Sequence, residues 1–521
     1  MNSLGRIVAI VRADFLLRFR RVSTVVLFLL LSAFAYVWVP APSSGRTLIQ
    51  INGHRAIYNS GAIGMGTASL AMIFIGLFGY YVISNAIRRD ITTRCGLVAA
   101  STPMRSVEYL LGKFLGNLTF LITFTGGFML SSMAMLLVRG EARLEPLVFV
   151  SQYLLLTPAA IILVSAVAVL FESIRFLSGK LGDVAYFFLF ITFIGVVASN
   201  EVSGGRIPWT RCLDFTGFGF MFHELQHTLH TDSVSIGASS FDPAAPTIIF
   251  PGLSMTPDWL LPRIISLVLP LGLLPLAALC FHRFDPVRIG RTTGKTHSQW
   301  LGKLQSFAKP LSRRAAAILA LPAFGHSLGA AMWIDAVLTL TLSPLVFVAF
   351  IVVSIVSLFS NPAATLPAVF AVLAIVIADV ATRDMRAGTI ASLYAVPRLR
   401  ENFAWWKLAA TLALSFVFCA VPLAKTALTD HARFFSLLIG LVFVAATTTF
   451  LGLVSRNSKT FIVLFLSFWY IVVNSKGAAP LLDFAGFFGT ATRQTLIVYG
   501  LVAMMCAVAA DVVHRARLAR T

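Results

Sequence analysis

Long apolar runs, separated by short polar segments, recur along most of the 521-residue chain. A helix needs about 20 apolar residues to cross the hydrocarbon of a bilayer, and runs of about 17 to 25 qualify. The pattern therefore predicts an all-α polytopic membrane protein with about 12 transmembrane helices, six in each half. The expected spans are residues 22–39, 63–87, 114–138, 147–171, 184–198 and 264–281, followed by 336–359, 366–381, 408–424, 435–454, 461–473 and 496–513.

The segment before the first run has a helical pattern of its own. Its apolar residues recur at helical spacing while its arginines lie off that stripe, as expected of an amphipathic helix. The stripe consists of Leu4, Val8, Val11, Phe15 and Phe19. We expect this helix to lie on the inner membrane surface. The first apolar run is therefore interpreted as an uncleaved span and not as a signal peptide.

One pattern of charged residues, R-D-x12-P-x9-K, occurs twice, each time just after an apolar run. The first copy is Arg89, Asp90, Pro103 and Lys113, and the second is Arg383, Asp384, Pro397 and Lys407. Internal repeats of this kind, here about 294 residues apart, indicate duplication of a structural unit. The chain is accordingly divided into a first half, residues 1–282, a basic linker, residues 283–321, and a second half, residues 322–521.

Composition and charge agree with a membrane protein. Mean hydropathy is +0.86 and only 12% of the residues are charged, against about 25% in soluble domains. A net charge of +20 does not indicate nucleic-acid binding, because no basic face or recognition motif accompanies it. With the N-terminus in the cytoplasm, about 30 of the 41 Lys and Arg residues fall on the inner side. Both termini and both repeated loops are then cytoplasmic, in a cell membrane such as a bacterial inner membrane.

The second copy of the repeat, RAGTIASLYAVPRLRENFAWWK, carries a family resemblance. Its Gly388, Thr389, Pro397 and Lys407 match the signature of ABC-2-type permeases, the membrane subunits of one class of ATP-binding-cassette exporters. The acidic residue that this family has after the proline corresponds to Glu401, and to Glu108 in the first copy. The first copy departs from the signature because Arg94 stands where glycine is expected.

The resemblance implies a function for the two loops. In such permeases each half has six spans, preceded by a surface helix that is expected around residues 324–335 in the second half. Separate cytoplasmic cassette subunits, two copies here, bind ATP and Mg²⁺ and dock on the loops between spans. The chain would be a permease, not an enzyme, and its residues 289–296 lack the first glycine of a phosphate-binding loop. The cargo expected is amphipathic or lipophilic.

The loop residues assigned to coupling by this resemblance are Arg89, Asp90, Pro103, Glu108, Lys113, Arg383, Asp384, Gly388, Pro397, Glu401 and Lys407.

A possible zinc site lies in the one long outer segment, residues 200–262. His223, Glu224 and His227 form H-E-x-x-H, a spacing that places two imidazoles on one helix face with a glutamate beside them. His230 or Asp232 could complete the coordination. The alternative is an outer amphipathic or re-entrant helix whose polar residues face water, as ABC-2-type permeases have between their fifth and sixth spans.

Two other function classes remain open. Internal repeats also occur in ion-coupled secondary transporters, which place ionisable groups near the middle of the membrane. Here Glu172, Asp379 and Asp511 lie near the inner ends of spans, which disfavours that class. A membrane metalloprotease would rest on the H-E-x-x-H segment alone.

Overall fold

Helices dominate the computed structural model, which describes residues 2–20, 22–202, 208–229, 234–242, 245–282, 284, 328–342 and 344–519. The chain divides into two units, residues 1–294 and 295–521. Within the described ranges, eight helices are long and apolar enough to cross a membrane. Three further pairs of helices pass the same test together, each pair bent by more than 40°. The chain is a multi-pass membrane protein.

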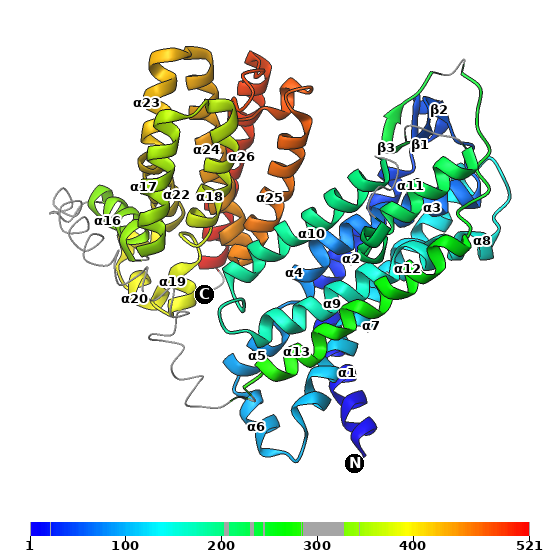
Figure 1. Cartoon of the computed structure of the whole chain (residues 1–521). Coiled ribbons are helices and arrows are strands. Elements are labelled where there is room, and N and C mark those ends of the chain that lie inside the picture. Colours follow the sequence, from blue (N-terminus) through cyan, green and yellow to red (C-terminus); the bar gives the residue numbers. More distant parts are fainter. Residues whose placement is uncertain are drawn as a thin grey trace. The chain divides into compact units, whose positions relative to one another are not determined.

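The first unit contains most of the described helices (Figure 1). They are α1 Ser3–Phe19, α2 Val22–Trp38, α3 Ser60–Phe74, α4 Tyr80–Ile83, α5 Ala86–Thr92, α6 Cys95–Ser101, α7 Ser106–Arg139, α8 Pro146–Leu156, α9 Pro158–Ser173, α10 Lys180–Val202, α11 Phe218–Leu229, α12 Pro257–Val268 and α13 Leu273–Cys280. Short 3₁₀ or π turns are η1 Pro42–Ser44, η2 Ile75–Gly79, η3 Pro208–Leu213 and η4 Leu269–Gly272.

The second unit is a helical bundle. Its elements are α16 Leu328–Leu342, α17 Pro344–Phe359, α18 Pro362–Ile377, α19 Arg383–Ala387, α20 Ile390–Tyr394, α21 Pro397–Glu401, α22 Phe403–Phe418, α23 Ala420–Thr429, α24 His431–Ser455, α25 Ser458–Ser475, η7 Pro480–Leu482 and α26 Arg493–Leu518. The linker segment and the residues 289–296 lie outside the described residues, apart from Phe284.

Eight of the expected spans coincide with helices that meet the length and hydropathy test. Two of the others are bent rather than straight. Residues 336–359 cross a 90° bend between α16 and α17, where Pro344 begins the second helix, and the residue before a proline is disfavoured in a helix. Residues 408–424 cross a 64° bend before Pro422. In a continuous helix the ring of Pro422 would clash with the backbone carbonyl of Phe418, four residues earlier. The helix α22 ends at Phe418.

In the described part of each unit, the first helix turns sharply into an apolar one. The angle is 78° between α1 and α2, and 90° between α16 and α17. On α1 the buried residues are Asp14 and Arg18, while Leu4 and Val8 are exposed. The exposed apolar side chains of Leu4 and Val8 suit contact with lipid.

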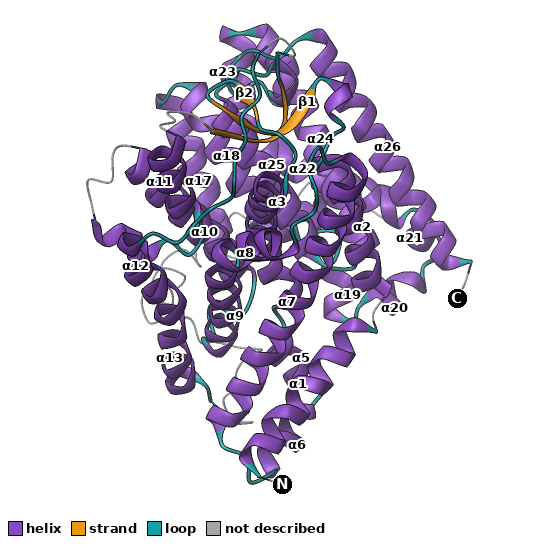
Figure 2. Cartoon of the chain, turned by 90° about the vertical axis from the view of Figure 1, so that its right-hand side faces the viewer, coloured by secondary structure: helices purple, strands orange, loops and turns teal. Residues whose placement is uncertain are grey.

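A small three-stranded sheet corrects the expectation of a purely helical chain. Strands β1 (Arg46–Ile51), β2 (His54–Arg55) and β3 (Val234–Ser240) are antiparallel in the order β2-β1-β3. Asn52 and Gly53 both have positive φ, as the tight turn of a two-residue hairpin requires. Figure 2 shows the sheet in orange, and in both views it lies at the end of the first unit opposite α6.

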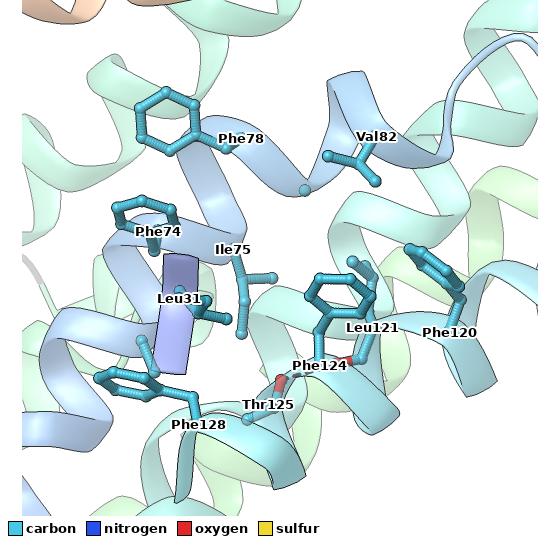
Figure 3. A pocket seen from close by; sticks show the side chains of 12 residues that line it. Leu31, Phe74, Ile75, Phe78, Val82, Phe120, Leu121, Phe124, Thr125 and Phe128 are labelled. Carbon is cyan, nitrogen blue, oxygen red and sulfur yellow. Dashed lines mark hydrogen bonds between the residues drawn. The ribbon is translucent and has the colours of Figure 1, made fainter. Parts of the chain in front are cut away.

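An apolar cavity of about 40 Å³ lies between α2, α7 and the segment α3–η2–α4. Figure 3 shows that Phe74, Phe78, Phe124 and Phe128 surround it together with Leu31. The hydroxyl of Thr125, its polar lining group, donates a hydrogen bond to a carbonyl of its own helix. A cavity of this chemistry favours an apolar group over water, and it has room for only part of a lipophilic molecule.

Candidate functional site

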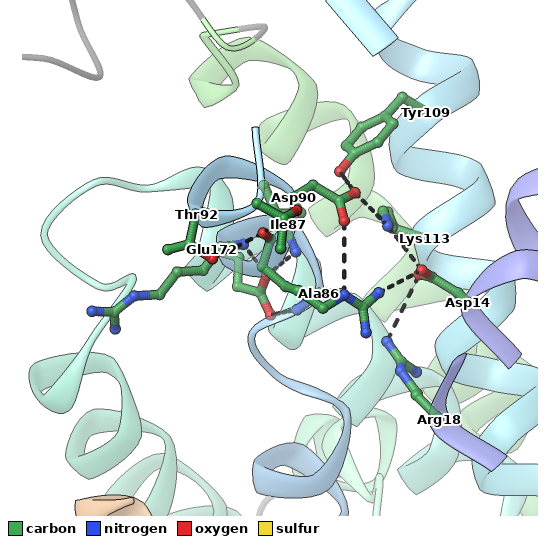
Figure 4. A network of polar contacts seen from close by, with 12 residues as sticks. Asp14, Arg18, Ala86, Ile87, Asp90, Thr92, Tyr109, Lys113 and Glu172 are labelled. Carbon is green, nitrogen blue, oxygen red and sulfur yellow. Dashed lines mark hydrogen bonds and ion pairs between the residues drawn. The ribbon is translucent and has the colours of Figure 1, made fainter. Parts of the chain in front are cut away.

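The first copy of the repeated motif folds into a cluster of buried charges. Lys113 Nζ lies 2.7 Å from Asp90 Oδ2 and 3.0 Å from Asp14 Oδ1, and Arg89 Nη2 lies 2.8 Å from the same Asp14 oxygen. The Tyr109 hydroxyl donates to Asp90 at 2.7 Å. Figure 4 shows Asp14 between Lys113 and Arg18. The cluster thereby joins three elements, α1, α5 and α7.

The second copy builds the same cluster. Lys407 Nζ lies 2.7 Å from Asp335 Oδ2 and also pairs with Asp384. Arg383 pairs with Asp335 as well, and one of its nitrogens donates to the Thr339 hydroxyl at 2.7 Å. Burial lowers the pKa of the Arg383 guanidinium, although the nearby Asp384 carboxylate acts to raise it. Here the joined elements are α16, α19 and α22.

The two clusters match position by position in exposure as well as in pairing. The side chains of Asp14, Arg89, Asp90 and Lys113 are 3, 20, 17 and 4% exposed. Their counterparts Asp335, Arg383, Asp384 and Lys407 are 6, 23, 17 and 1% exposed. Buried charges are tolerated only when they are paired, and loss of one partner costs about 3–5 kcal/mol. Each cluster therefore fastens its loop to the helix before it, α1 or α16, and to the helix after it, α7 or α22.

Close helix packing positions the first cluster. A Cβ at Gly112 would lie 2.9 Å from Ile10, and one at Gly116 would lie 3.4 Å from Asp14. Glycine at these two positions, one turn apart on α7, lets α1 approach until Asp14 reaches Lys113. At the other side of the loop, Glu172 accepts hydrogen bonds from the backbone N–H groups of Ala86 and Ile87, the first residues of α5, at 3.1 and 2.6 Å.

The loop backbone repeats even where the sequence does not. Gly388 ends α19 with a φ of 72°, and Arg94, at the matching position of the first loop, has a φ of 60°. The missing glycine of the first copy therefore does not alter the turn. Pro103 lies in the turn between α6 and α7, and Pro397 is the first residue of α21.

The two predicted acidic residues beside the prolines are not equivalent. Glu108 accepts from Arg6 at 2.9 Å and from the backbone N–H of Arg105 at 3.1 Å, which closes a capping box at the start of α7. Glu401 is exposed at the end of α21. The residue that matches Glu108 in spacing is Asn402, whose side chain donates to the Arg398 carbonyl at 3.0 Å.

The sequence analysis missed two members of the site, Asp14 and Asp335. A signal for them existed, because Asp14 is the only acidic residue before Asp90, and Asp335 is the only one between Asp285 and Asp379. A lone carboxylate in such a long basic and apolar stretch needs a partner when it is buried.

The H-E-x-x-H segment lies on α11. The rings of His223 and His227 are 6.5 Å apart, and Glu224 is buried and accepts a hydrogen bond from Ser254 at 2.6 Å. Among the residues that the structure describes, no three His, Cys, Asp or Glu side chains are grouped to hold a metal ion. His230 and Asp232 lie outside that part of the chain, so zinc binding by this segment stays a prediction.

Comparisons of the chain with protein-family models, with curated proteins and with solved structures find no match.

Proposed function

We propose that this chain is the membrane subunit of an ATP-driven exporter, and that its two repeated loops receive the force of separate ATP-hydrolysing subunits. The observation that carries the proposal is the double occurrence of one buried charge cluster, Asp14 with Arg89, Asp90 and Lys113, and the corresponding Asp335 with Arg383, Asp384 and Lys407. A loop that is fastened on both sides moves together with the helices to which it is bound.

The loops also present surface to a partner. On α6, Leu97 is 43% exposed and Val98 is 68% exposed. Apolar side chains at the tip of a charged loop favour docking of another protein, since association buries such groups. Ser392, at the position of α20 that matches Val98, is exposed as well.

A pull-down with the full chain tests the docking. The chain is expressed with its candidate cassette subunits, which a neighbouring gene is expected to encode, and ATPase activity of the co-purified complex is measured. We expect Val98→Asp and Ser392→Asp each to reduce the recovered ATPase about tenfold, because a charge is placed in the interface. Leu428→Asp on α23 is the control, since Leu428 is 87% exposed and lies at the opposite end of the second unit from α20.

The proposal is wrong if no ATPase co-purifies with the chain from native membranes, or if both loop variants retain it fully.

Transport in vesicles distinguishes an ATP-driven exporter from the alternative, an ion-coupled secondary transporter. An ATP-driven exporter needs ATP in the absence of ion gradients, whereas a secondary transporter works without ATP when a proton or sodium gradient is imposed.

A further inference from the structure

A second site is a cavity of about 470 Å³ inside the second unit. Its walls come from α19, α20 and the ends of α22, α24 and α26, next to the loop that carries the charge cluster. Arg386, Arg456 and Arg517 line it together with Tyr394 and His514, and none of its lining residues is acidic. Three guanidinium groups thus surround one space without a carboxylate among them.

The neighbours of these arginines leave the cavity positive. Arg386 is held at 2.9 Å by Asp379, which lies outside the lining, and by Ser458 at 2.7 Å. Arg517 donates to the last carbonyls of α24, at Leu453 and at Val454. Burial raises the pKa of Tyr394, whereas the charges of Arg456 and Arg517 lower it.

Arg456 lines the cavity from the end of α24. This residue follows α24 with a φ of 54°, in the left-handed region that favours glycine. The Arg456 guanidinium makes no ion pair with a residue in the described part of the chain. A left-handed residue is common where a helix ends, so the feature that marks this site is a guanidinium that lines the cavity with no acidic residue in the lining.

The matching region of the first unit is filled. There Phe284 packs edge-on against Tyr109, and a Cβ on Gly96 would lie 2.4 Å from the Phe284 ring. The space that remains is about 10 Å³. Thr92 takes the place of Arg386 in the repeat. The cavity and its charges are therefore specific to the second unit and do not follow from the repeated fold.

We propose that this cavity binds a phosphate group, and that the phosphate is the headgroup of an anionic phospholipid. Guanidinium groups bind phosphate oxygens through paired, charge-assisted hydrogen bonds. Basic pockets between the ends of spanning helices bind such headgroups on the cytoplasmic side of membranes, which is the side that the charge pattern predicts for this end of the chain. The proposal stands independently of the exporter function.

Lipid retention by the full chain tests the proposal. The purified protein is equilibrated with equal amounts of phosphatidylglycerol and phosphatidylcholine, and the retained lipids are counted by native mass spectrometry. We expect the wild type to prefer phosphatidylglycerol. Arg456→Gln lowers this preference about tenfold, because one charge-assisted contact is lost. Arg456→Gly removes the same charge and relaxes the left-handed backbone, so it keeps the test valid if the glutamine variant does not fold.

Arg515→Gln is the matched control, since Arg515 is on the same helix as Arg517, has a side chain that is 69% exposed and does not line the cavity. A second arm measures the thermal shift on addition of inorganic phosphate without lipid, at constant ionic strength. A shift that needs Arg456, without lipid preference, supports the phosphate site and identifies a soluble phosphate as its ligand. Equal lipid preference and equal phosphate response in wild type, Arg456→Gly and Arg515→Gln overturn the proposal.

Discussion

Arg94 and Gly388 occupy matching turns of the two loops, with φ values of 60° and 72°. No atom lies within 4 Å of a Cβ added at Gly388, so a side chain there meets only the backbone cost of the left-handed conformation. That cost is already present at Arg94. The turn therefore forms with or without glycine, and glycine only makes it less costly.

This difference between the twin positions gives the first prediction. Gly388→Ala should destabilise the protein by about 1 kcal/mol, because alanine is strained at positive φ. Arg94→Ala should change stability by less than about 0.5 kcal/mol, since arginine and alanine are equally strained by a positive φ at this position. Thermal unfolding in detergent measures the two variants side by side. Equal losses at both positions would contradict the argument from backbone strain.

At the scale of elements, the hairpin of β1 and β2 is fastened to the end of α7 by one carboxylate. Glu141 accepts two hydrogen bonds from the Arg55 guanidinium, at 2.6 and 2.8 Å, and one from the backbone N–H of Tyr58 at 3.0 Å. The Arg55 hydrogen bonds, together with the Tyr58 N–H, hold the pKa of Glu141 below its usual value of 4.5.

The sign of this shift predicts a pH dependence. A carboxyl group whose pKa is lowered in the folded state stabilises that state above pH 4.5, and the contribution is lost as the pH falls below 4.5 through the lowered value. Hydrogen exchange of the hairpin amides, corrected for intrinsic rates, should therefore accelerate about threefold in acid for the wild type. Glu141→Gln should exchange at the faster rate throughout. The exposed Glu145 provides the control, as Glu145→Gln should follow the wild type.

The membrane helices could be predicted because their signal is local, whereas the sheet and the bends could not. A run of apolar residues marks a span wherever it occurs. In contrast, β1 pairs with β3, so that Thr47 lies opposite Ser239, and nothing in either segment alone identifies the other. The Asn52-Gly53 turn was a local signal that the sequence analysis overlooked. Pro422 and Pro344 were visible too, but a proline inside an apolar run does not reveal the direction of the bend.

The residues of the site, like the elements of the fold, could be predicted only where their signal is local. The spacing of Arg89, Asp90 and Lys113 repeats along the chain, so the pattern itself identified them. Asp14 joins the cluster only through the packing of α1 on α7, which depends on Gly112 and Gly116. The sequence showed that the helix was amphipathic but not that Asp14 and Arg18 are buried against α7.

At the scale of the whole molecule, the two units share one cluster but differ around it. In the first unit Arg18 adds a third cation and donates to Asn117 at 2.6 Å. In the second, Lys407 lies over the ring of Trp406, 4.2 Å from its centroid. The units are thus related but unequal, and each has its own loop to present to a partner.

If the two loops serve one ATP-driven cycle, as proposed, they should be separable in stability but not in function. Asp14→Asn and Asp335→Asn each leave buried cations without a partner, so each should cost about 3 kcal/mol. Because the two residues belong to different units, we expect the double variant to lose the sum, to within about 0.5 kcal/mol. Under the proposed exporter function, ATP-driven transport should behave differently, since both loops would have to be coupled for the cycle to run. Either single variant should reduce transport about as far as the double variant does, measured at a temperature where all remain folded, with Arg515→Gln as the control. If the double variant is much less active than both single variants, the two loops act independently, and a common motor that needs both is excluded.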